Sequence, residues 1–331
     1  MKPSNIEKRF IMLLSLIAPC FNEEGNVKKF FDEVNRVFDL RPEQIEFVFV
    51  DDGSSDSTFE KLTEIYNDNP SANIQVISFS RNFGKESAMY AGLSNAKGDM
   101  VCIIDADLQQ RPEVVVEMLD AMAEDDTLDC VTAYQEKRHE NGALAKVKSS
   151  FYKLINNMSE VDFVNGASDF RLMKRNMVDA LVSMTEYHRF SKGLFSWVGF
   201  KTKYIPYEVA DRFEGESKWS VRKLIKYALE GIFAFSTAPL RMATYLGLFS
   251  SFISIVYLII IVIQKIFFGI EVKGYPTIVV LILFIGGIQL FCFGLLGEYI
   301  SKMYVQTKNR PIYIERKHLS RNNTQFDITG E

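Results

Sequence analysis

Cysteine and histidine are scarce in this 331-residue chain, which contains four cysteines and three histidines. The cysteines lie in or beside apolar runs and form no CxxC pair, and the histidines are far apart in the sequence. We therefore predict neither a disulfide framework nor a zinc site, and we expect reduced, buried thiols in a cytosolic setting. The residues concerned are Cys20, Cys102, Cys130 and Cys292, and His139, His188 and His318.

An excess of positive charge is also lacking, because 38 Lys and Arg residues face 42 Asp and Glu residues, which leaves a net charge of −4. This balance does not indicate the excess of basic residues that nucleic-acid-binding proteins carry, so we expect no nucleic-acid partner. Two glycine-rich patterns are missing as well, since no GxGxxG follows the first apolar run and GxxxxGK[ST] occurs nowhere. The sequence therefore does not predict a backbone loop that cradles phosphate.

Apolar runs alternate with amphipathic stretches in the first 135 residues. The runs LLSLIAP, FVFVDD, IQVISFS, MVCIIDAD and DCVTAY predict strands, and residues 27–40, 58–67, 84–95 and 113–124 predict helices between them. The first run is too short for a convincing secretory signal, so a buried strand is the better interpretation. This alternation predicts a parallel sheet that is covered by helices on both faces.

Polar residues gather where three of these predicted strands end. They are Pro19, Asn22 and Glu23 after the first strand, Asp51 and Asp52 at the end of the second, and Asp105, Asp107 and Gln109 after the fourth. The carboxyl ends of parallel strands meet at the edge where open α/β sheets bind ligands, so the three clusters predict one site.

The ligand that these clusters predict is a nucleotide with a metal ion. Asp107 and Gln109 offer the oxygen ligands that Mg²⁺ or Mn²⁺ prefers, and a metal there would neutralise a diphosphate. Asp51 and Asp52 suit the hydroxyl and N–H groups of a ribose and a base, because ionised carboxylates only accept hydrogen bonds. The alternative for the bare DxD is an acidic, solvated turn.

Two other enzyme or signalling classes share parts of this pattern. Phosphatases and phosphotransferases of the haloacid dehalogenase type also carry DxD after an apolar strand, but usually on the first strand and followed by Thr or Val, whereas Leu108 follows here. Receiver domains end an early strand in an acidic pair, but they have no reason to carry Gln109 or apolar C-terminal runs. Both remain minor alternatives.

The C-terminal third contains two uncharged apolar runs, residues 243–263 and 277–297. Each is long enough as a helix, at ~1.5 Å per residue, to cross ~30 Å of hydrocarbon. The short connector predicts a transmembrane hairpin, and a pair of core helices in a soluble protein is the alternative. Basic residues flank the outer ends, at Lys218, Arg222, Lys223, Lys226 and Arg241 and at Lys302, Lys308, Arg310, Arg316 and Lys317. The connector carries only Lys265 and Lys273, so both termini are predicted to be cytoplasmic.

The segments APCFNEEGNV, VFVDDGSSDST, RNFGKESAMYAGLSNAKGDMVCIIDADLQQRPE, ASDFRLMKR and RFEGESKWS stand in the order found in inverting glycosyltransferases of family 2. The chain most resembles the polyprenyl-phosphate branch, which includes bactoprenol glucosyltransferases and, more distantly, dolichyl-phosphate mannose synthase. The resemblance implies an α/β fold: a cytosolic, Rossmann-like GT-A domain with a mixed, mainly parallel sheet. Interfacial helices and a two-helix transmembrane hairpin follow that domain.

The resemblance also implies a role for each candidate residue. Asp105 and Asp169 are catalytic, Asp107 and Gln109 bind Mg²⁺ or Mn²⁺, and the remaining residues bind the nucleotide or the phosphates. The nucleotide residues are Pro19, Asn22, Glu23, Asp51 and Asp52, and the phosphate and acceptor residues are Arg138, Arg212, Ser217 and Lys218. Two alternatives stay open, namely Glu23 as a helix cap and Lys218 as a juxtamembrane positive charge. The individual phosphate contacts in the basic loop at 135–148 also stay open.

The predicted organisation has four parts. They are a GT-A domain at residues 1–215, juxtamembrane interfacial helices at 216–240, the hairpin at 241–300 and a cytosolic tail at 301–331. The stretch from Lys218 to Phe235 has apolar residues at helical spacing beside basic ones, which suits a helix lying on anionic headgroups. A core helix of the soluble domain is the alternative there.

The predicted reaction moves a sugar, with inversion, from a UDP-sugar to undecaprenyl phosphate at the cytosolic face of the plasma membrane. The product is a lipid-linked sugar donor for the cell envelope. Glucose is the expected sugar, while N-acetylglucosamine, galactose and mannose stay open, as does a non-catalytic, membrane-anchored sugar-nucleotide sensor. The expected partners are the UDP-sugar, the polyprenyl phosphate, the bilayer, further copies of the chain in a homo-oligomer such as a tetramer, and a downstream flippase.

Overall fold

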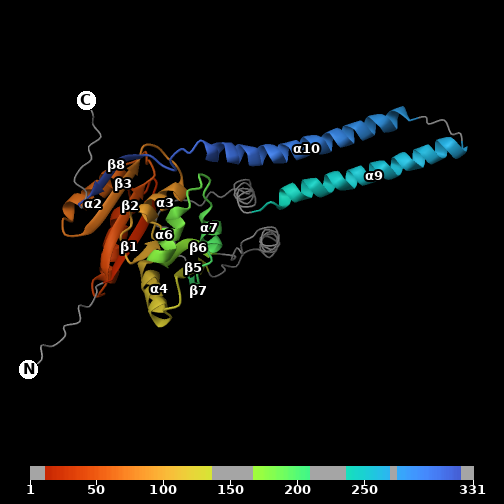
Figure 1. Ribbon diagram of the computed structural model, residues 1–331. Helices are drawn as coiled ribbons and strands as arrows, with labels where there is room; N and C mark the ends of the chain where they lie inside the picture. Colours follow the sequence, from red (N-terminus) through yellow and green to blue (C-terminus); the bar gives the residue numbers. More distant parts are fainter. Residues whose placement is uncertain (1–11, 136–166, 209–235, 269–273, 322–331) are drawn as a thin grey trace, which may run out of the picture. The chain divides into compact units, whose positions relative to one another are not determined.

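The computed structural model describes residues 12–135, 167–208, 236–268 and 274–321 (Figure 1). The chain divides into two compact units. The first unit comprises residues 1–152, 162–220 and 311–331, and the second comprises residues 153–161 and 221–310. The predicted interfacial helices lie mainly outside the described residues.

The described part of the first unit is built on an eight-stranded sheet with the order β7-β5-β6-β4-β1-β2-β3-β8. Strands β4, β1, β2 and β3 run parallel, β6 runs antiparallel to both of its neighbours, and β8 runs antiparallel to β3. This arrangement confirms the predicted mixed, mainly parallel sheet. The strands are β1 Leu13–Cys20, β2 Gln44–Asp51, β3 Asn73–Phe79, β4 Met100–Ile103, β5 Cys130–Gln135, β6 Ala167–Lys174, β7 Thr202–Tyr207 and β8 Glu315–Ser320.

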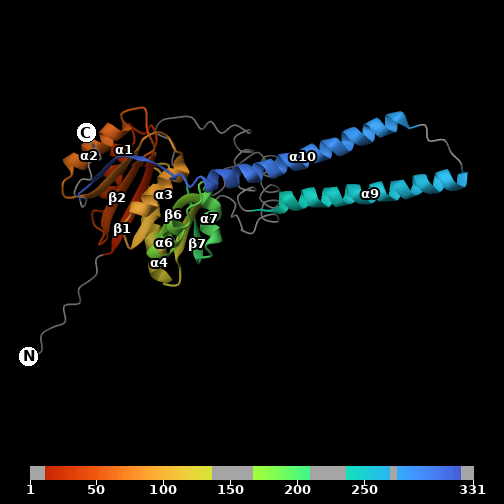
Figure 2. The ribbon, with the colours of Figure 1, turned by 45° about the horizontal axis from the view of Figure 1, so that its top comes forward.

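Helices cover both faces of this sheet, as the sequence predicted (Figures 1 and 2). Side chains of β1 alternate between the two faces. Leu14 and Leu16 are buried in the core that α1, α2 and α4 form, whereas Ile17 packs against Gly92 of α3 on the opposite face. The helices of this unit are α1 Val27–Phe38, α2 Thr58–Asp68, α3 Lys85–Asn95, α4 Pro112–Glu124, α6 Arg175–Ser183 and α7 Ser191–Trp197.

Helix α3 lies very close to the sheet because Gly92 has no side chain. A Cβ atom at Gly92 would stand 2.2 Å from Cγ2 of Ile17, which is far inside van der Waals contact. The close approach fixes α3 against β1 and β2. Since the functional side chains described below stand at the N-terminal end of α3, this packing positions them.

The last strand, β8, was not predicted. Residues 301–331 were predicted to form a cytosolic tail, but Glu315–Ser320 pairs with β3 and completes one edge of the sheet. Tyr313, just before β8, stacks on Phe79 with the ring centroids 4.8 Å apart. Arg321, just after it, donates hydrogen bonds to the carbonyl oxygens of Tyr66, Asn69 and Ala72. The chain therefore returns to the first unit after the apolar helices.

The second unit contains two long apolar helices, α9 Ala238–Phe268 and α10 Tyr275–Thr307. Residues 238–267 and 277–307 each have a mean hydropathy of 2.7 in their most apolar window, and none of that window is buried. Tyr299 of α10 donates a hydrogen bond to the carbonyl oxygen of Ser236, which precedes α9, at 2.7 Å. Both helices have the length and composition of membrane spans, in agreement with the predicted hairpin.

We expect Tyr313→Ala to destabilise the first unit by about 2 kcal/mol, because it removes a half-buried ring that packs on Phe79. Thermal unfolding of the purified, detergent-solubilised protein measures the effect. Leu40→Ala is the matched control, since Leu40 is 95% exposed and its truncation should leave the melting temperature unchanged. Equal melting temperatures for the two variants would contradict the assignment of the C-terminal segment to this unit.

Candidate active site

The three polar clusters predicted from the sequence meet at one edge of the sheet. Strand β1 lies between β2 and β4 and is parallel to both, so their carboxyl ends point the same way. Cys20 is the partner of Asp51 in the strand register, and the amide of Ile104 donates to the carbonyl oxygen of Ile17 at 3.0 Å. The predicted convergence is therefore present in the fold.

The loop after β1 is tied to the loop after β2. The side-chain oxygen of Asn22 accepts a hydrogen bond from the amide of Ser55 at 2.9 Å, and the amide of Asn22 donates to Oγ of Ser54 at 3.0 Å. Asn22 adopts a left-handed conformation, with φ of 57°, which asparagine tolerates better than most residues. Pro19 is half-buried at the end of β1.

Glu23 also has a structural partner. Its carboxylate accepts a hydrogen bond from the side chain of Asn26 at 2.6 Å, just before α1, and its amide donates to Oγ1 of Thr58 at 2.8 Å. The N-cap of α1 is Asn26, with no side-chain cap hydrogen bond, so Glu23 contacts the residue at the helix start and is not itself the cap. A nucleotide contact by Glu23 stays a prediction.

Asp51 and Asp52 are adjacent but serve different parts of the structure. Both are buried, with exposures of 1% and 3%. Asp51 accepts hydrogen bonds from the amide of Ser54 at 3.0 Å and from Oγ of Ser78 at 2.8 Å. Asp52 accepts from the amides of Phe83 at 2.7 Å and Gly84 at 2.9 Å. Asp52 therefore fixes the chain that leads into α3, a structural role that the sequence did not suggest.

The Asp105–Gln109 turn is held by Gln110, a residue that the sequence analysis missed. Gln110 accepts a hydrogen bond from the amide of Asp105 at 2.8 Å and donates to Oδ2 of the same residue at 2.9 Å. Leu108 has a φ of 59°, an unusual conformation for a bulky side chain and one that concentrates at functional sites. In this turn Asp105 and Asp107 are partly exposed, whereas Ala106 between them is buried.

Asp107 and Gln109 fit the predicted divalent metal by their chemistry. The amide of Gln109 donates to Oδ1 of Asp107 at 3.1 Å, so the two residues are held together, and both are partly exposed. Across the described ranges, no group of three or more His, Cys, Asp or Glu side chains could hold a metal ion. A site with so few protein ligands is typical of an ion like Mg²⁺, because that ion takes most of its ligands from water and phosphate.

Lys85, the first residue of α3, is a charged residue of the site that the sequence analysis left without a role. Its Nζ lies 2.6 Å from Oδ1 of Asp105 and 3.6 Å from Oδ2 of Asp169. Burial lowers the pKa of the Lys85 ammonium, but the carboxylates of Asp105, Asp169 and Asp107 outweigh that effect and raise it above the ordinary value. Lys85 therefore stays charged and brings Asp169, on β6, to the same point as Asp105.

Four of the predicted site residues lie outside the described residues, namely Arg138, Arg212, Ser217 and Lys218. Of the other nine, Asp105 and Asp169 share Lys85, while Asp107 and Gln109 share a turn. Pro19, Asn22, Glu23, Asp51 and Asp52 lie on the adjoining strand ends. Only the RNFGKES segment could have indicated Lys85, because it places a lysine directly after the glycine that precedes α3.

Fold and site together define an α/β protein with an acidic candidate ligand site at the carboxyl edge of parallel strands. The chain also has two membrane-length helices. Residues 15–182 match the family described as Glycosyl transferase family 2, and residues 238–303 match the GtrB C-terminal hairpin. The chain belongs to glycosyl transferase family 2. The two membrane-length helices and the hairpin match indicate association with a membrane.

Curated relatives match almost the whole chain. The bactoprenol glucosyl transferase of Shigella phage SfII is 42% identical over 92% of this chain and 98% of its own length. The prophage bactoprenol glucosyl transferase homolog of Escherichia coli K12 is 40% identical over 92% of this chain and 99% of its own. An uncharacterized glycosyltransferase of Synechocystis is 39% identical over 91% of this chain and 94% of its own.

Solved structures are more distant. Mannosyl-3-phosphoglycerate synthase from Rubrobacter xylanophilus is 17% identical, covers 66% of this chain and 71% of its own, and has a TM-score of 0.45. Glucosyl-3-phosphoglycerate synthase from Mycobacterium tuberculosis with Mn²⁺ and UDP-glucose is 14% identical, covers 67% of this chain and 77% of its own, and has a TM-score of 0.42.

We expect Lys85→Met to lower glycosyl transfer at least 100-fold, because the carboxylates of Asp105 and Asp169 lose the cation between them. Lys85→Arg should keep part of the activity. Lys61→Met, which removes an exposed lysine paired with Glu64, is the control. Wild-type turnover in Lys85→Met would refute the role.

Proposed function

We propose that the protein is a membrane-bound, inverting glucosyltransferase that moves glucose from UDP-glucose to undecaprenyl phosphate. The observation that carries this proposal is the 42% identity, over almost the full length of both chains, to proteins named bactoprenol glucosyl transferase. The match includes the C-terminal hairpin, so the relatives share the membrane part as well as the catalytic part. A lipid acceptor that cannot leave the bilayer requires such an anchor.

The donor binds at the carboxyl edge of β1, β2 and β4 in this proposal. Asp51 accepts from the uridine end, and the Asn22–Ser55 contact holds the neighbouring loop in place. Lys85 supplies positive charge beside Asp105, where charge develops on the departing diphosphate. Arg212, Ser217 and Lys218 keep the phosphate role that the family resemblance implies.

Asp107 and Gln109 are the proposed ligands of a divalent ion, Mg²⁺ or Mn²⁺. Their oxygen atoms are hard donors, which such ions prefer. When bound, the ion would neutralise charge on the diphosphate. The remaining chemistry belongs to side chains that hold the two substrates in line.

Asp169 is the proposed acceptor-side carboxylate. The second pKa of a phosphate monoester is near ~6, so most of the acceptor is already a dianion at neutral pH. Asp169 therefore mainly orients the attacking oxygen and takes the last proton when it is present. Its contact with Lys85 at 3.6 Å holds the carboxylate in place for this task. One in-line displacement would invert the anomeric carbon, so an α-linked donor would give a β-linked lipid.

The test of the proposed function is transfer from a panel of UDP-sugars to undecaprenyl phosphate by the purified full-length protein, with Mg²⁺ or Mn²⁺. We expect UDP-glucose to be the best donor. Asp107→Asn should lower its turnover at least 100-fold while the protein stays folded, because the change removes a metal ligand and no packing group. Asp68→Asn, at the exposed end of α2, is the control. Wild-type turnover in Asp107→Asn, or equal turnover in EDTA, would remove the metal from the proposal.

We also propose that the catalytic unit and both termini face the cytoplasm, because basic residues flank the outer ends of α9 and α10. Protease added outside intact cells should then reach at most residues 264–276. Immunoblots with tags at either terminus would detect the cleavage. Cleavage anywhere in residues 1–239 would contradict this orientation. With the catalytic unit in the cytoplasm, as proposed, a flippase would be needed to carry the polar headgroup of the product across the bilayer.

A further inference from the structure

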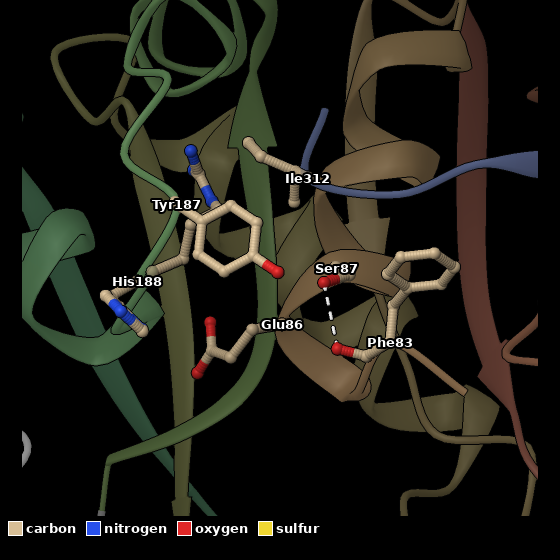
Figure 3. A pocket seen from close by; sticks show the side chains of 7 residues that line it. Phe83, Glu86, Ser87, Tyr187, His188 and Ile312 are labelled. Atoms are coloured by element: carbon tan, nitrogen blue, oxygen red, sulfur yellow. Dashed lines mark hydrogen bonds between the residues drawn. The ribbon is translucent and has the colours of Figure 1, made fainter. Parts of the chain in front are cut away.

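A cavity of about 190 Å³ lies at the N-terminal end of α3 (Figure 3). Its lining includes Phe83, Glu86, Tyr187, His188 and Ile312, and also Arg189. Glu86 follows Lys85 directly in the first turn of α3, so the cavity begins beside the residue that joins Asp105 and Asp169. None of the lining residues was predicted from the sequence to bind a substrate.

Glu86 lines this cavity, and among the described residues only one of its two carboxyl oxygens accepts hydrogen bonds. Its Oε2 accepts hydrogen bonds from the amide of Ser191, at 3.0 Å, and from the Ser191 hydroxyl. Among the described residues no hydrogen bond is made to Oε1. Burial and, after it, the charge of Asp169 raise the pKa of Glu86 to about 7. A carboxyl with such a pKa is partly protonated at neutral pH, so it can both accept and donate hydrogen bonds.

The charges around the cavity favour a neutral ligand. Arg189 is the basic counterpart of Glu86, and its guanidinium donates to the carbonyl oxygens of Met184 and Leu181 and lies over the Tyr90 ring. Because an acidic and a basic group share the cavity, neither an anion nor a cation is strongly preferred. A phosphate would meet the Glu86 carboxyl, and an isoprenoid chain would leave the polar lining without partners.

The polar and aromatic side chains of the lining suit a hydroxylated ring such as a pyranose. Figure 3 shows the Tyr187 ring and the Glu86 carboxyl facing the same space, with Phe83 and Ile312 on its other side. Aromatic rings offer flat apolar surfaces, and a few polar groups among them fix the orientation of a ligand. At ~30 Å³ for each water, the cavity has room for several water-sized groups, as a hydroxylated ring requires.

We propose that this cavity binds the hexose of the donor and that Glu86 recognises hydroxyl groups of that hexose. The inference rests on the proposed function, because only an enzyme that uses a sugar nucleotide has a donor hexose to bind. It makes Glu86, Tyr187 and His188 the residues that distinguish one hexose from another. The lipid acceptor would then approach from another side of Asp169.

Glu86→Gln tests the proposal, because it keeps the shape of the side chain and removes the carboxyl. We expect the KM for UDP-glucose to rise at least tenfold, the discrimination between UDP-glucose and UDP-galactose to fall, and the KM for undecaprenyl phosphate to change less than twofold. Calorimetry should show unchanged affinity for UDP, which lacks the hexose, and weaker binding of UDP-glucose. Glu117→Gln, on the exposed face of α4, is the matched control and should behave as the wild type.

His188→Ala serves as a second variant that spares the fold, since His188 is exposed and does not hold α7 as Glu86 does. A raised KM for the lipid with an unchanged KM for UDP-glucose in these variants would assign the cavity to the acceptor and overturn the proposal. Unchanged donor kinetics in both variants would overturn it too. If the wild type transfers no sugar, the proposed function fails. Calorimetry then decides the cavity alone, which fails if Glu86→Gln binds UDP-glucose as the wild type does.

Discussion

The contact of Lys85 with two carboxylates is the interaction on which the site depends. Asp105 and Asp169 come from β4 and β6, whose ends would repel each other without a cation between them. Burial disfavours the ammonium, but three carboxylates outweigh it, so the charge persists. The position of this cation is set by backbone contacts, since Asp52 holds the chain just before Lys85 and Gly92 lets α3 lie against β1. A small number of packing contacts thus decides the electrostatics of the whole edge.

The sequence predicted the convergence of Asp51, Asp105 and Asp107 because parallel strands bring their carboxyl ends to one edge. That rule needs only the strand order and the position of each acidic residue in its strand. It could not predict the contact of Lys85 with Asp169 on β6 or that of Glu86 with Ser191 on α7, because these partners lie more than eighty residues away along the chain. Side-chain pairs across such separations depend on the packing of α3, which no periodicity in the sequence reveals.

The apolar helices were easy to predict and strand β8 was not. Uncharged runs as long as those in α9 and α10 have few structural alternatives, so composition alone identified them. The sequence of β8, ERKHLS, is mostly polar and forms an edge of the sheet, where charged residues are common. Such a strand resembles a solvated tail until its pairing with β3 is seen. Asp52 is a similar case, because its acidic side chain serves the backbone of residues 83 and 84.

The place of β8 in the chain has a consequence for biosynthesis. A ribosome completes β1 to β7 before it makes α9 and α10, and it makes β8 last. Until then β3 is an open edge, the feature by which sheets recruit foreign strands and aggregate. The catalytic unit therefore reaches its final form only after the membrane segments have left the ribosome. A chain that ended before β8 would leave the β3 edge unpaired and open to foreign strands.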